Sequence, residues 1–218
     1  MVYKIQFPIS NRSALLIALF LGLMSHSALA DFEKGIAAYQ ADNLPLAYKE
    51  FRDSAEKGHM ESQFNLAVMF EQGIGVQKDD AQALEWYSKS AAQGNAGAQF
   101  NLGVLYENGR GTAVDFAKAN AWYRKASMQG DAMAIGNLGM LYIRGDGVKA
   151  NMVAGVALLL VSATLDTSPE NFARRNLSST RGLTPDIVAA AQALSDEMTK
   201  GKNLLFPLDA YLAKAQKP

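Results

Sequence analysis

Cysteine is absent from this chain of 218 residues, and histidine is rare. Without a thiol the chain can form neither a disulfide nor a cysteine-based metal site, and it offers no cysteine for lipid attachment. Of its two histidines, His26 lies in the first thirty residues and His59 stands alone in the remainder. A zinc site or a histidine-based catalytic triad would thus depend on carboxylates. The sequence predicts no metal site, no cofactor and no enzymatic activity.

An excess of charge is also missing, since 21 lysines and arginines face 21 aspartates and glutamates. Removal of the first thirty residues takes away Lys4 and Arg12 and leaves 19 basic against 21 acidic residues, a net charge of −2. Binding to nucleic acid needs a basic surface, so we expect no nucleic-acid partner. β-Branched residues are sparse while alanine, leucine and glycine dominate, which predicts an all-α fold.

The first thirty residues are typical of a secretory signal peptide. Lys4 and Arg12 form a basic lead, and residues 14–24 are largely apolar. This run of eleven residues is too short to span a bilayer, which takes about 20 residues. Ala28 and Ala30 supply the small side chains that signal peptidase requires, so we expect cleavage after Ala30. The mature protein is then periplasmic or secreted, without stable membrane insertion. An uncleaved membrane anchor is the alternative.

The rest of the chain is organised by an internal repeat of 36 residues. Residues 62–97 and 98–133 are identical at seventeen of 36 positions. A third copy continues in phase and then loses the Trp-Tyr pair to Leu158 and Leu159. Repeats of this length stack their apolar faces into a solenoid, and such arrays usually bind partners on an extended surface.

Each repeat predicts two helices separated by a glycine loop. The first helices are expected at about residues 61–72, 97–108 and 133–144. They end where glycine can adopt the left-handed conformation, at Gly73, Gly109 and Gly145. The second helices start at the capping residues Asp79, Asp115 and Asn151. We expect Trp86 and Trp122 of the second helices to be buried between consecutive units. Small residues in the first helices should allow close packing, at Ala67, Gly103 and Gly139.

A shorter helical hairpin is predicted before the first full repeat. Residues 32–41 and 46–57 read as its two helices, joined by Asp42-Asn43-Leu44-Pro45. Proline is favoured at the first position of a helix, so the second helix is expected to start there. This hairpin should cap the N-terminal end of the array.

The repeated pattern N-L-G-x-x-Y-x-x-G-x-G, an aspartate, A-x-x-W-Y-x-K-A and Q-G resembles the Sel1-like repeat. It is clearest from Asn101-Leu102-Gly103 to Gln129-Gly130. The resemblance implies an all-α, right-handed α/α solenoid of Sel1-like, tetratricopeptide-like hairpins, with units at about 31–60, 61–96, 97–132 and 133–165. It also implies an adaptor role in bacterial envelope, motility, secretion or signalling systems. Cysteine-rich relatives carry a disulfide in each repeat, which this chain cannot form.

The repeat stops after residue 165, and residues 166–218 are expected to form a C-terminal helical cap and tail. Ser168-Pro169-Glu170 and Thr184-Pro185-Asp186 each place a capping residue before a proline, which predicts two helix starts. The tail is apolar at residues 204–208 and at Tyr211-Leu212. It either docks on the solenoid or binds a partner.

One catalytic pattern occurs, because Ser54-Ala55-Glu56-Lys57 matches the S-x-x-K of penicillin-binding enzymes. No Lys-Thr-Gly or Ser-Asp-Asn motif accompanies it. The recurring Gly-x-Gly also lacks the Gly-Lys-Ser/Thr of a phosphate-binding loop. We therefore expect an exported, non-enzymatic scaffold for protein–protein interactions in the bacterial cell envelope. The alternative is a peptidoglycan-associated protein with penicillin-binding or hydrolase activity.

Polar residues recur one repeat apart on the predicted first helices, which line the concave surface of tetratricopeptide-like solenoids. These candidate partner-binding residues are Asn65, Gln72, Asn101, Asn108, Asn137 and Arg144. Asparagine both donates and accepts hydrogen bonds, which suits it to hold the backbone of an extended peptide. The competing interpretation is that the asparagines tie adjacent helices together. The expected partner is another protein or peptide, with peptidoglycan as the alternative.

Overall fold

The computed structural model describes residues 11–201 and 203–215, with side chains from residue 26 onward. Within this part of the chain it contains eleven α-helices and no strand, which confirms the predicted all-α class. Its contacts divide the chain into two compact units, the first ending at Lys78 and the second beginning at Asp79. Among the helices described, none has the length and apolar character that a membrane span requires. The start of the predicted leader, residues 1–10, lies outside the described residues.

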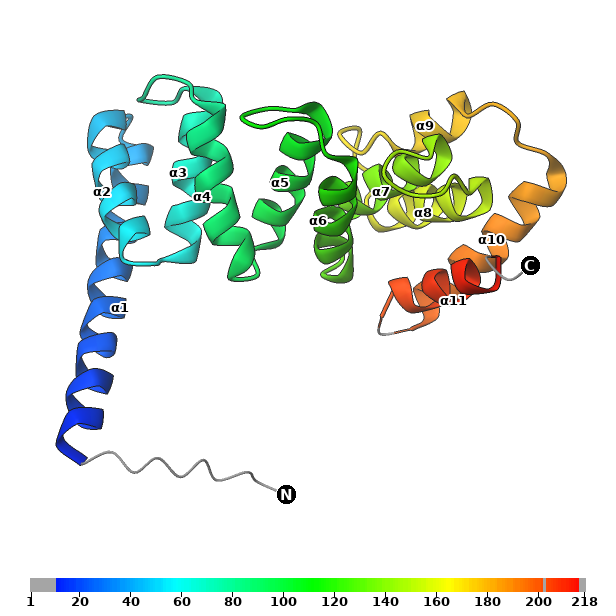
Figure 1. The fold of residues 1–218 in the computed structure, drawn as a ribbon. Helices are drawn as coiled ribbons and strands as arrows, with labels where there is room; N and C mark the ends of the chain where they lie inside the picture. The colour runs from blue at the N-terminus through cyan, green and yellow to red at the C-terminus, as the bar shows by residue number, and fades with distance from the viewer. Residues whose placement is uncertain (1–10, 202, 216–218) are drawn as a thin grey trace. The chain divides into compact units, whose positions relative to one another are not determined.

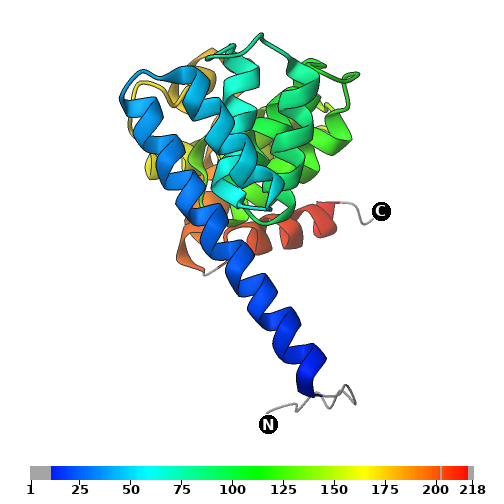
Figure 2. The same cartoon turned by 90° about the vertical axis from the view of Figure 1, so that its left-hand side faces the viewer.

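The first unit consists of three helices packed in sequence order (Figure 1). They are α1 (Asn11–Gln40), α2 (Leu44–Glu56) and α3 (Met60–Gln72). α2 packs against both of the others. Figure 2 shows α1 continuing well beyond α2, since its helical backbone starts long before the predicted helix at residues 32–41. The predicted cleavage point after Ala30 thus lies within a helix.

Local chemistry explains the hairpin of α1 and α2. Asn43 caps α2 by accepting a hydrogen bond from the backbone N–H of Leu46 at 3.3 Å, and Pro45 lies in the first turn, as predicted. The two helices approach closely at Gly35, where an added Cβ would lie 2.6 Å from the ring of Phe51. The hairpin expected from the sequence is therefore present.

The second unit contains eight helices. They are α4 (Asp80–Ala92), α5 (Ala96–Asn108), α6 (Phe116–Met128), α7 (Ala132–Arg144), α8 (Met152–Leu165), α9 (Ala173–Ser179), α10 (Pro185–Lys200) and α11 (Leu205–Ala215). Neighbouring helices pack in order from α4 to α8, and α9 and α10 both pack against α8 (Figure 1). The repeat helices begin and end within one or two residues of their predicted bounds.

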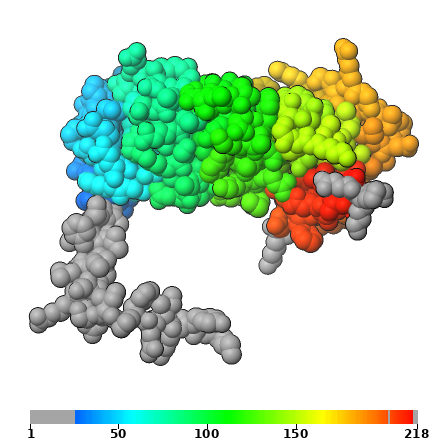
Figure 3. Space-filling view, viewed as in Figure 1, coloured from blue at the N-terminus to red at the C-terminus, as the bar shows by residue number. Residues whose placement is uncertain are grey.

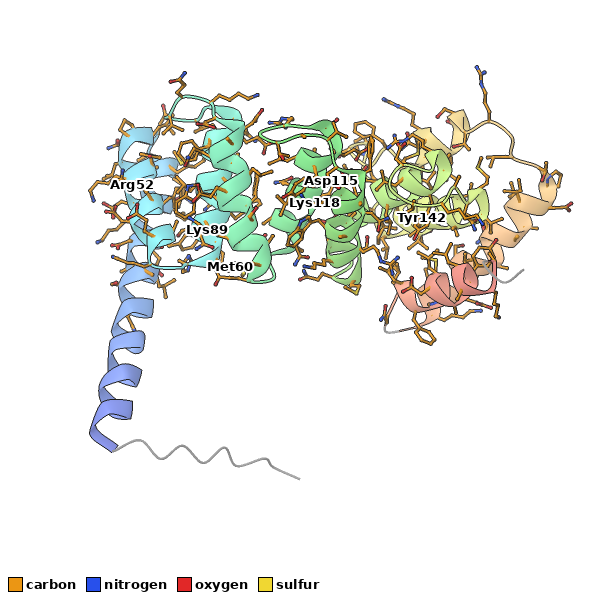
Figure 4. The ribbon with its side chains drawn as sticks, in the orientation of Figure 1. Arg52, Met60, Lys89, Asp115, Lys118 and Tyr142 are labelled. Atoms are coloured by element: carbon orange, nitrogen blue, oxygen red, sulfur yellow. The ribbon has the colours of Figure 1, made fainter. Side chains whose placement is uncertain are left out.

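The predicted helix ends are confirmed in every repeat. Gly73, Gly109 and Gly145 have φ of 72°, 66° and 79°, and each ends its helix in the left-handed conformation. In the second unit, Asp115 and Asn151 each accept hydrogen bonds from backbone N–H groups of the helix that they precede. Figure 4 labels Asp115 together with Lys118, whose N–H it accepts at 2.9 Å.

The second glycine of each Gly-x-Gly loop has a packing role. An added Cβ at Gly147 would lie 2.5 Å from the backbone carbonyl carbon of Phe116, at the start of α6. An added Cβ at Gly75 would similarly lie 2.8 Å from Leu44, at the start of α2. Each loop therefore rests on the start of the second helix of the preceding repeat, and only glycine leaves room for this contact. The motif is architectural.

Small residues bring α7 and α8 together. An added Cβ at Gly139 would lie 2.8 Å from the carbonyl oxygen of Gly155, and one at Gly155 would lie 2.7 Å from the carbonyl oxygen of Gly139. The same position in the preceding repeat, Gly103, lies against the ring of Tyr123. The prediction that small residues here serve packing is confirmed.

The buried aromatic residues differ from those predicted. Trp86 is 9% exposed, which agrees with the prediction, but Trp122 is only partly buried, so its predicted burial was wrong. The Lys125 ammonium lies 4.0 Å from the centre of the Trp122 ring, and Lys89 lies 3.8 Å from that of Trp86, so this contact is common to both tryptophans and does not explain their difference. Tyr87 and Tyr123 are fully buried instead.

The C-terminal segment departs from the prediction at Ser168 and agrees with it at Thr184. Thr184 caps α10 and Pro185 follows it. Ser168-Pro169-Glu170 starts no helix, because the Asp166 carboxylate accepts the N–H and the hydroxyl of Ser168 and holds a turn. α9 begins later, at Ala173.

The apolar tail forms α11, a helix that the sequence did not predict. It packs against α10 and α6, and Figure 3 shows it, in red, lying against the rest of the second unit. Leu205 and Leu208 are buried in the core of that unit. Of the two alternatives left by the sequence, docking is the one observed for residues 203–215.

Candidate functional site

An apolar hollow of about 230 Å³ lies in the first compact unit, between α1 and α3. Ile36 and Tyr39 of α1 form one side, and Phe64, Asn65 and Val68 of α3 form the other. Phe64 and Val68 are one helical turn apart, so both side chains reach the same face of α3. Tyr39 is 46% exposed at this hollow. One predicted partner-binding residue, Asn65, therefore borders a cavity that could accept an apolar side chain.

Two other predicted residues, Asn137 and Arg144, belong to one hydrogen-bond network in the second unit. The hydroxyl of Tyr123 donates to Glu107 at 2.7 Å and accepts from the amide of Asn137 at 3.1 Å. The Arg144 guanidinium donates to the other oxygen of Glu107 at 2.6 Å. The network links α5, α6 and α7. For Asn137 this is the contact that the helix-tying interpretation expects.

The electrostatics of this network keep Tyr123 protonated. Burial of its side chain raises the pKa of Tyr123, and the nearby Glu107 carboxylate raises it further. The phenol is therefore a neutral hydrogen-bond donor at physiological pH, and Glu107 is shared between Tyr123 and Arg144. This arrangement stabilises the repeat and presents no free reactive group.

The remaining predicted residues are not brought together with these two. The Asn108 amide donates to the Val104 carbonyl of its own helix at 2.9 Å and is exposed. Asn101 is partly buried, and Gln72 is exposed at the end of α3. Partner binding by the six residues stays a prediction.

Sequence reasoning missed a pair of buried glutamines. The Gln63 amide donates to the carbonyl of Ala55 at 3.1 Å, and the Gln99 amide donates to that of Ala91 at 3.2 Å. Both side chains are only 5% exposed and hold a first helix to the helix before it. The sequence shows that the same residue, glutamine, recurs at positions 63 and 99, one repeat apart. The role of tying adjacent helices together was nevertheless assigned to the asparagines.

The S-x-x-K pattern does not form a nucleophile site. The Ser54 hydroxyl is fully buried and donates to the carbonyl oxygen of Ala28 at 2.6 Å, while the Ser62 hydroxyl donates to Ser54 at 2.7 Å. Lys57 pairs with Asp31, whose pKa it holds below the usual value, and not with Ser54. Catalysis needs an accessible serine within reach of its base. The geometry therefore gives no support to a penicillin-binding activity.

His59 has a structural role at the start of α3. Its Nδ1 accepts the backbone N–H of Ser62 at 3.3 Å and caps the helix, and its ring packs near Phe32. Among the described residues, no group of three or more histidine, aspartate or glutamate side chains is placed to hold a metal ion.

Comparison with known proteins identifies the repeat. The model of the Sel1 repeat matches residues 61–95, 96–131 and 132–166. The crystal structure of a Sel1 repeat protein from Oxalobacter formigenes superposes with a TM-score of 0.62 and 27% identity, over 79% of this chain and 74% of that one. A protective antigen of uropathogenic Escherichia coli strains that displays an SLR fold superposes with a TM-score of 0.50 and 28% identity, over 88% of this chain and 49% of that one.

Two curated proteins share a shorter segment. Negative regulators of exopolysaccharide production from Rhizobium leguminosarum bv. viciae and Rhizobium meliloti (strain 1021) are 40% and 38% identical over 58 residues. The match covers 27% of this chain and only 22% of each relative. Because the three matched repeats coincide with the helices from α3 to α8 and the solved structures share the fold, residues 61–166 of this chain belong to the Sel1 repeat family.

Proposed function

We propose that this protein is an exported, non-enzymatic scaffold that binds an extended segment of a partner protein in the bacterial cell envelope. Sel1 repeats are protein-interaction modules, which supports the class of function. The N-terminal features of a signal peptide support export, with cleavage after Ala30. The exopolysaccharide regulators share one short stretch with this chain, so we propose a common mode of interaction and not a common pathway.

The observation that carries the proposal is the hollow between α1 and α3. Its walls are apolar, which suits one aliphatic or aromatic side chain of a partner. The Asn65 amide at its edge can both donate to and accept from a peptide backbone. An extended segment that places one apolar side chain in the hollow and its backbone along Asn65 fits both features.

Photo-crosslinking in living cells tests this binding site. A benzophenone amino acid replaces Tyr39, which borders the hollow and is partly exposed. The matched control places the same amino acid at Arg52, an exposed residue of α2 that does not line the hollow. We expect a discrete protein adduct from position 39 and none from position 52. Phe64→Ala should abolish the adduct.

An outcome with no adduct at position 39, or the same adduct at both positions, would contradict the proposal. The Asn65→Ala variant separates the two interpretations of the asparagine. Loss of the adduct with an unchanged melting temperature supports a role in binding. A lowered melting temperature with the adduct retained shows that Asn65 serves the fold alone.

A further inference from the structure

An open groove of about 490 Å³ lies between α10 and α11 on the surface of the second unit. α11 runs back alongside α10 after a short connection at residues 201–204, so each helix supplies one wall (Figure 1). The exposed side chains of the two walls are Ala190, Ala193 and Glu197 of α10 and Phe206, Ala210 and Lys214 of α11. The groove is therefore a surface feature, separate from the core that holds the other side of α11.

The groove combines an apolar projection with an apolar floor. Phe206 is 71% exposed, which makes it the most exposed large hydrophobic side chain of the described residues. Ala190 and Ala193 are one helical turn apart on the opposite wall, and their small side chains leave room above them. Aromatic residues are enriched where proteins meet. The same face thus offers a ring and a place that a ring can occupy.

Two opposite charges lie at opposite ends of the groove. Glu197 is near the end of α10 and therefore lies close to the connection, where α11 begins. Lys214 is the last residue but one of α11 and lies at the far end. Neither side chain forms an ion pair with another residue in the described part of the chain. A two-fold axis through the groove would bring each charge opposite its counterpart in a second copy.

We propose that the groove between α10 and α11 is the interface of a symmetric homodimer. The Phe206 ring of each copy lies on Ala190 and Ala193 of the other, because the two-fold axis exchanges the walls and the ends of the groove together. Glu197 of each copy pairs with Lys214 of the other. The face consists of only two helices, so the buried area is at the low end for a dimer and the complex dissociates on dilution.

The dimer is independent of the proposed partner-binding site, because the groove belongs to the second unit and the hollow to the first. It gives the assembled protein two copies of the hollow. Two linked sites hold a partner that carries two matching segments more tightly than one site does. Failure of partner crosslinking at the hollow would leave the dimer unaffected, and a monomeric chain could still bind a partner there.

Sedimentation velocity of the full chain over a concentration series measures the dimer. We expect a shift from monomer to dimer as concentration rises. Phe206→Asp should raise the dissociation constant at least about tenfold, because it removes the central ring and adds a charge to the apolar floor of the other copy. Phe172→Asp is the matched control, since Phe172 is also a half-exposed phenylalanine but lies outside the groove. It should leave the dissociation constant unchanged.

Charge exchange tests the symmetry of the interface. Glu197→Lys places lysine opposite lysine in the dimer, and Lys214→Glu places glutamate opposite glutamate, so each variant alone should dimerise at least about tenfold more weakly. An equimolar mixture of the two variants restores an opposite pair at both ends of the groove. We expect the mixture to form a heterodimer of wild-type stability. Restoration on mixing also shows that both variants are folded.

Three results would each overturn the proposal. The first is a wild-type chain that stays monomeric at every concentration. The second is a dimer that Phe206→Asp leaves intact while circular dichroism shows its helices retained. The third is a pair of charge variants that do not associate when mixed. This last result stands even if Phe206→Asp fails to fold, because Glu197 and Lys214 are exposed and their exchange leaves the core unchanged.

Discussion

Trp122 and Tyr123 are neighbours in the chain but have different environments. Tyr123 is fully buried against Gly103 and bonded to Glu107, whereas Trp122 is partly buried and lies under the Lys125 ammonium. The repeat pattern correctly predicted that this pair faces the array. It could not decide which ring is buried, because adjacent helix positions differ by about 100° in direction and both lie near the edge of the apolar face.

The two tryptophans should therefore contribute unequally to stability. Trp86→Ala should lower the free energy of unfolding by about 3 to 5 kcal/mol, because it empties a buried site. Trp122→Ala should cost less than about 2 kcal/mol, because part of its ring surface is already in water. Urea unfolding followed by circular dichroism measures both. Equal losses would show that the exposure of Trp122 is not maintained in solution.

Tyr123→Phe tests the network of α5, α6 and α7. It leaves the Asn137 amide without its acceptor and removes one donor from Glu107, so we expect a loss of about 1 to 2 kcal/mol at neutral pH. Tyr39→Phe is the control, since that side chain is 46% exposed, and it should change stability little. Urea unfolding at pH 7 gives both values.

The raised pKa of Tyr123 gives this contribution a pH dependence. In the folded state the phenol stays protonated, whereas in the unfolded state it ionises at about pH 10. Stability due to the raised pKa is fully present below pH 10 and is lost as pH rises toward the folded-state value. Between pH 9 and 11 the advantage of wild type over Tyr123→Phe should shrink by about 1 kcal/mol. A constant difference would argue that Tyr123 is accessible to water.

At the scale of helices, the sequence predicted what local chemistry determines. The glycines at the helix ends and the aspartate or asparagine residues at the helix starts predicted the bounds of the repeat helices to within one or two residues. The prediction at Ser168 failed although the deciding contact is local, because the carboxylate of Asp166, two residues earlier, accepts the N–H and the hydroxyl of Ser168 and holds a turn where the pattern predicted a helix start. α11 was missed because Pro207 interrupts the apolar run in its first turn, where proline is in fact tolerated.

The candidate site was less predictable for the same reason. Recurrence at the repeat spacing located Asn65 and Asn137. It could not show that Asn65 lies at the edge of a hollow, whereas Asn137 donates a hydrogen bond to Tyr123. That distinction depends on which aromatic residue stands opposite each asparagine. Only the folded arrangement gives this information.

The contact between Gly139 and Gly155 makes a prediction for α7 and α8. Gly139→Ala would ordinarily gain up to about 1 kcal/mol in helix propensity. Its new methyl group would meet the carbonyl oxygen of Gly155, so we expect a net loss of stability and a lower melting temperature. Ala189→Gly, on the exposed side of α10, is the control, because it measures the effect of helix propensity alone on stability. A rise in melting temperature for Gly139→Ala would mean that the two helices are further apart.

At the scale of the whole molecule, stacking of repeats replaces covalent linkage. The chain holds its fold without a disulfide, through loops that rest on the preceding repeat, through α9 and α10 packed against α8, and through α11 packed against α10 and α6. Absence of cysteine also leaves the fold independent of the redox state of its compartment.

The proposed export gives a prediction for the intact protein. The mature form recovered from the periplasmic or secreted fraction should begin at Asp31, which intact-mass measurement shows directly. Ala30→Arg should block this cleavage and leave the longer form. Recovery of a wild-type chain that retains residues 1–30 would instead favour the uncleaved anchor.

The hydrogen bond from Ser54 to Ala28 sets an order of events for such processing. Ala28 is 2% exposed and helical, whereas a peptidase must thread an extended, accessible segment through its active site. The proposed cleavage must therefore be complete before α1 packs onto α2. A precursor allowed to fold first should resist purified signal peptidase, and the same precursor presented in detergent before folding should be cut. Slowing the formation of the α1–α2 hairpin, for instance by Phe51→Ala, should widen the time window and raise the yield of mature chain.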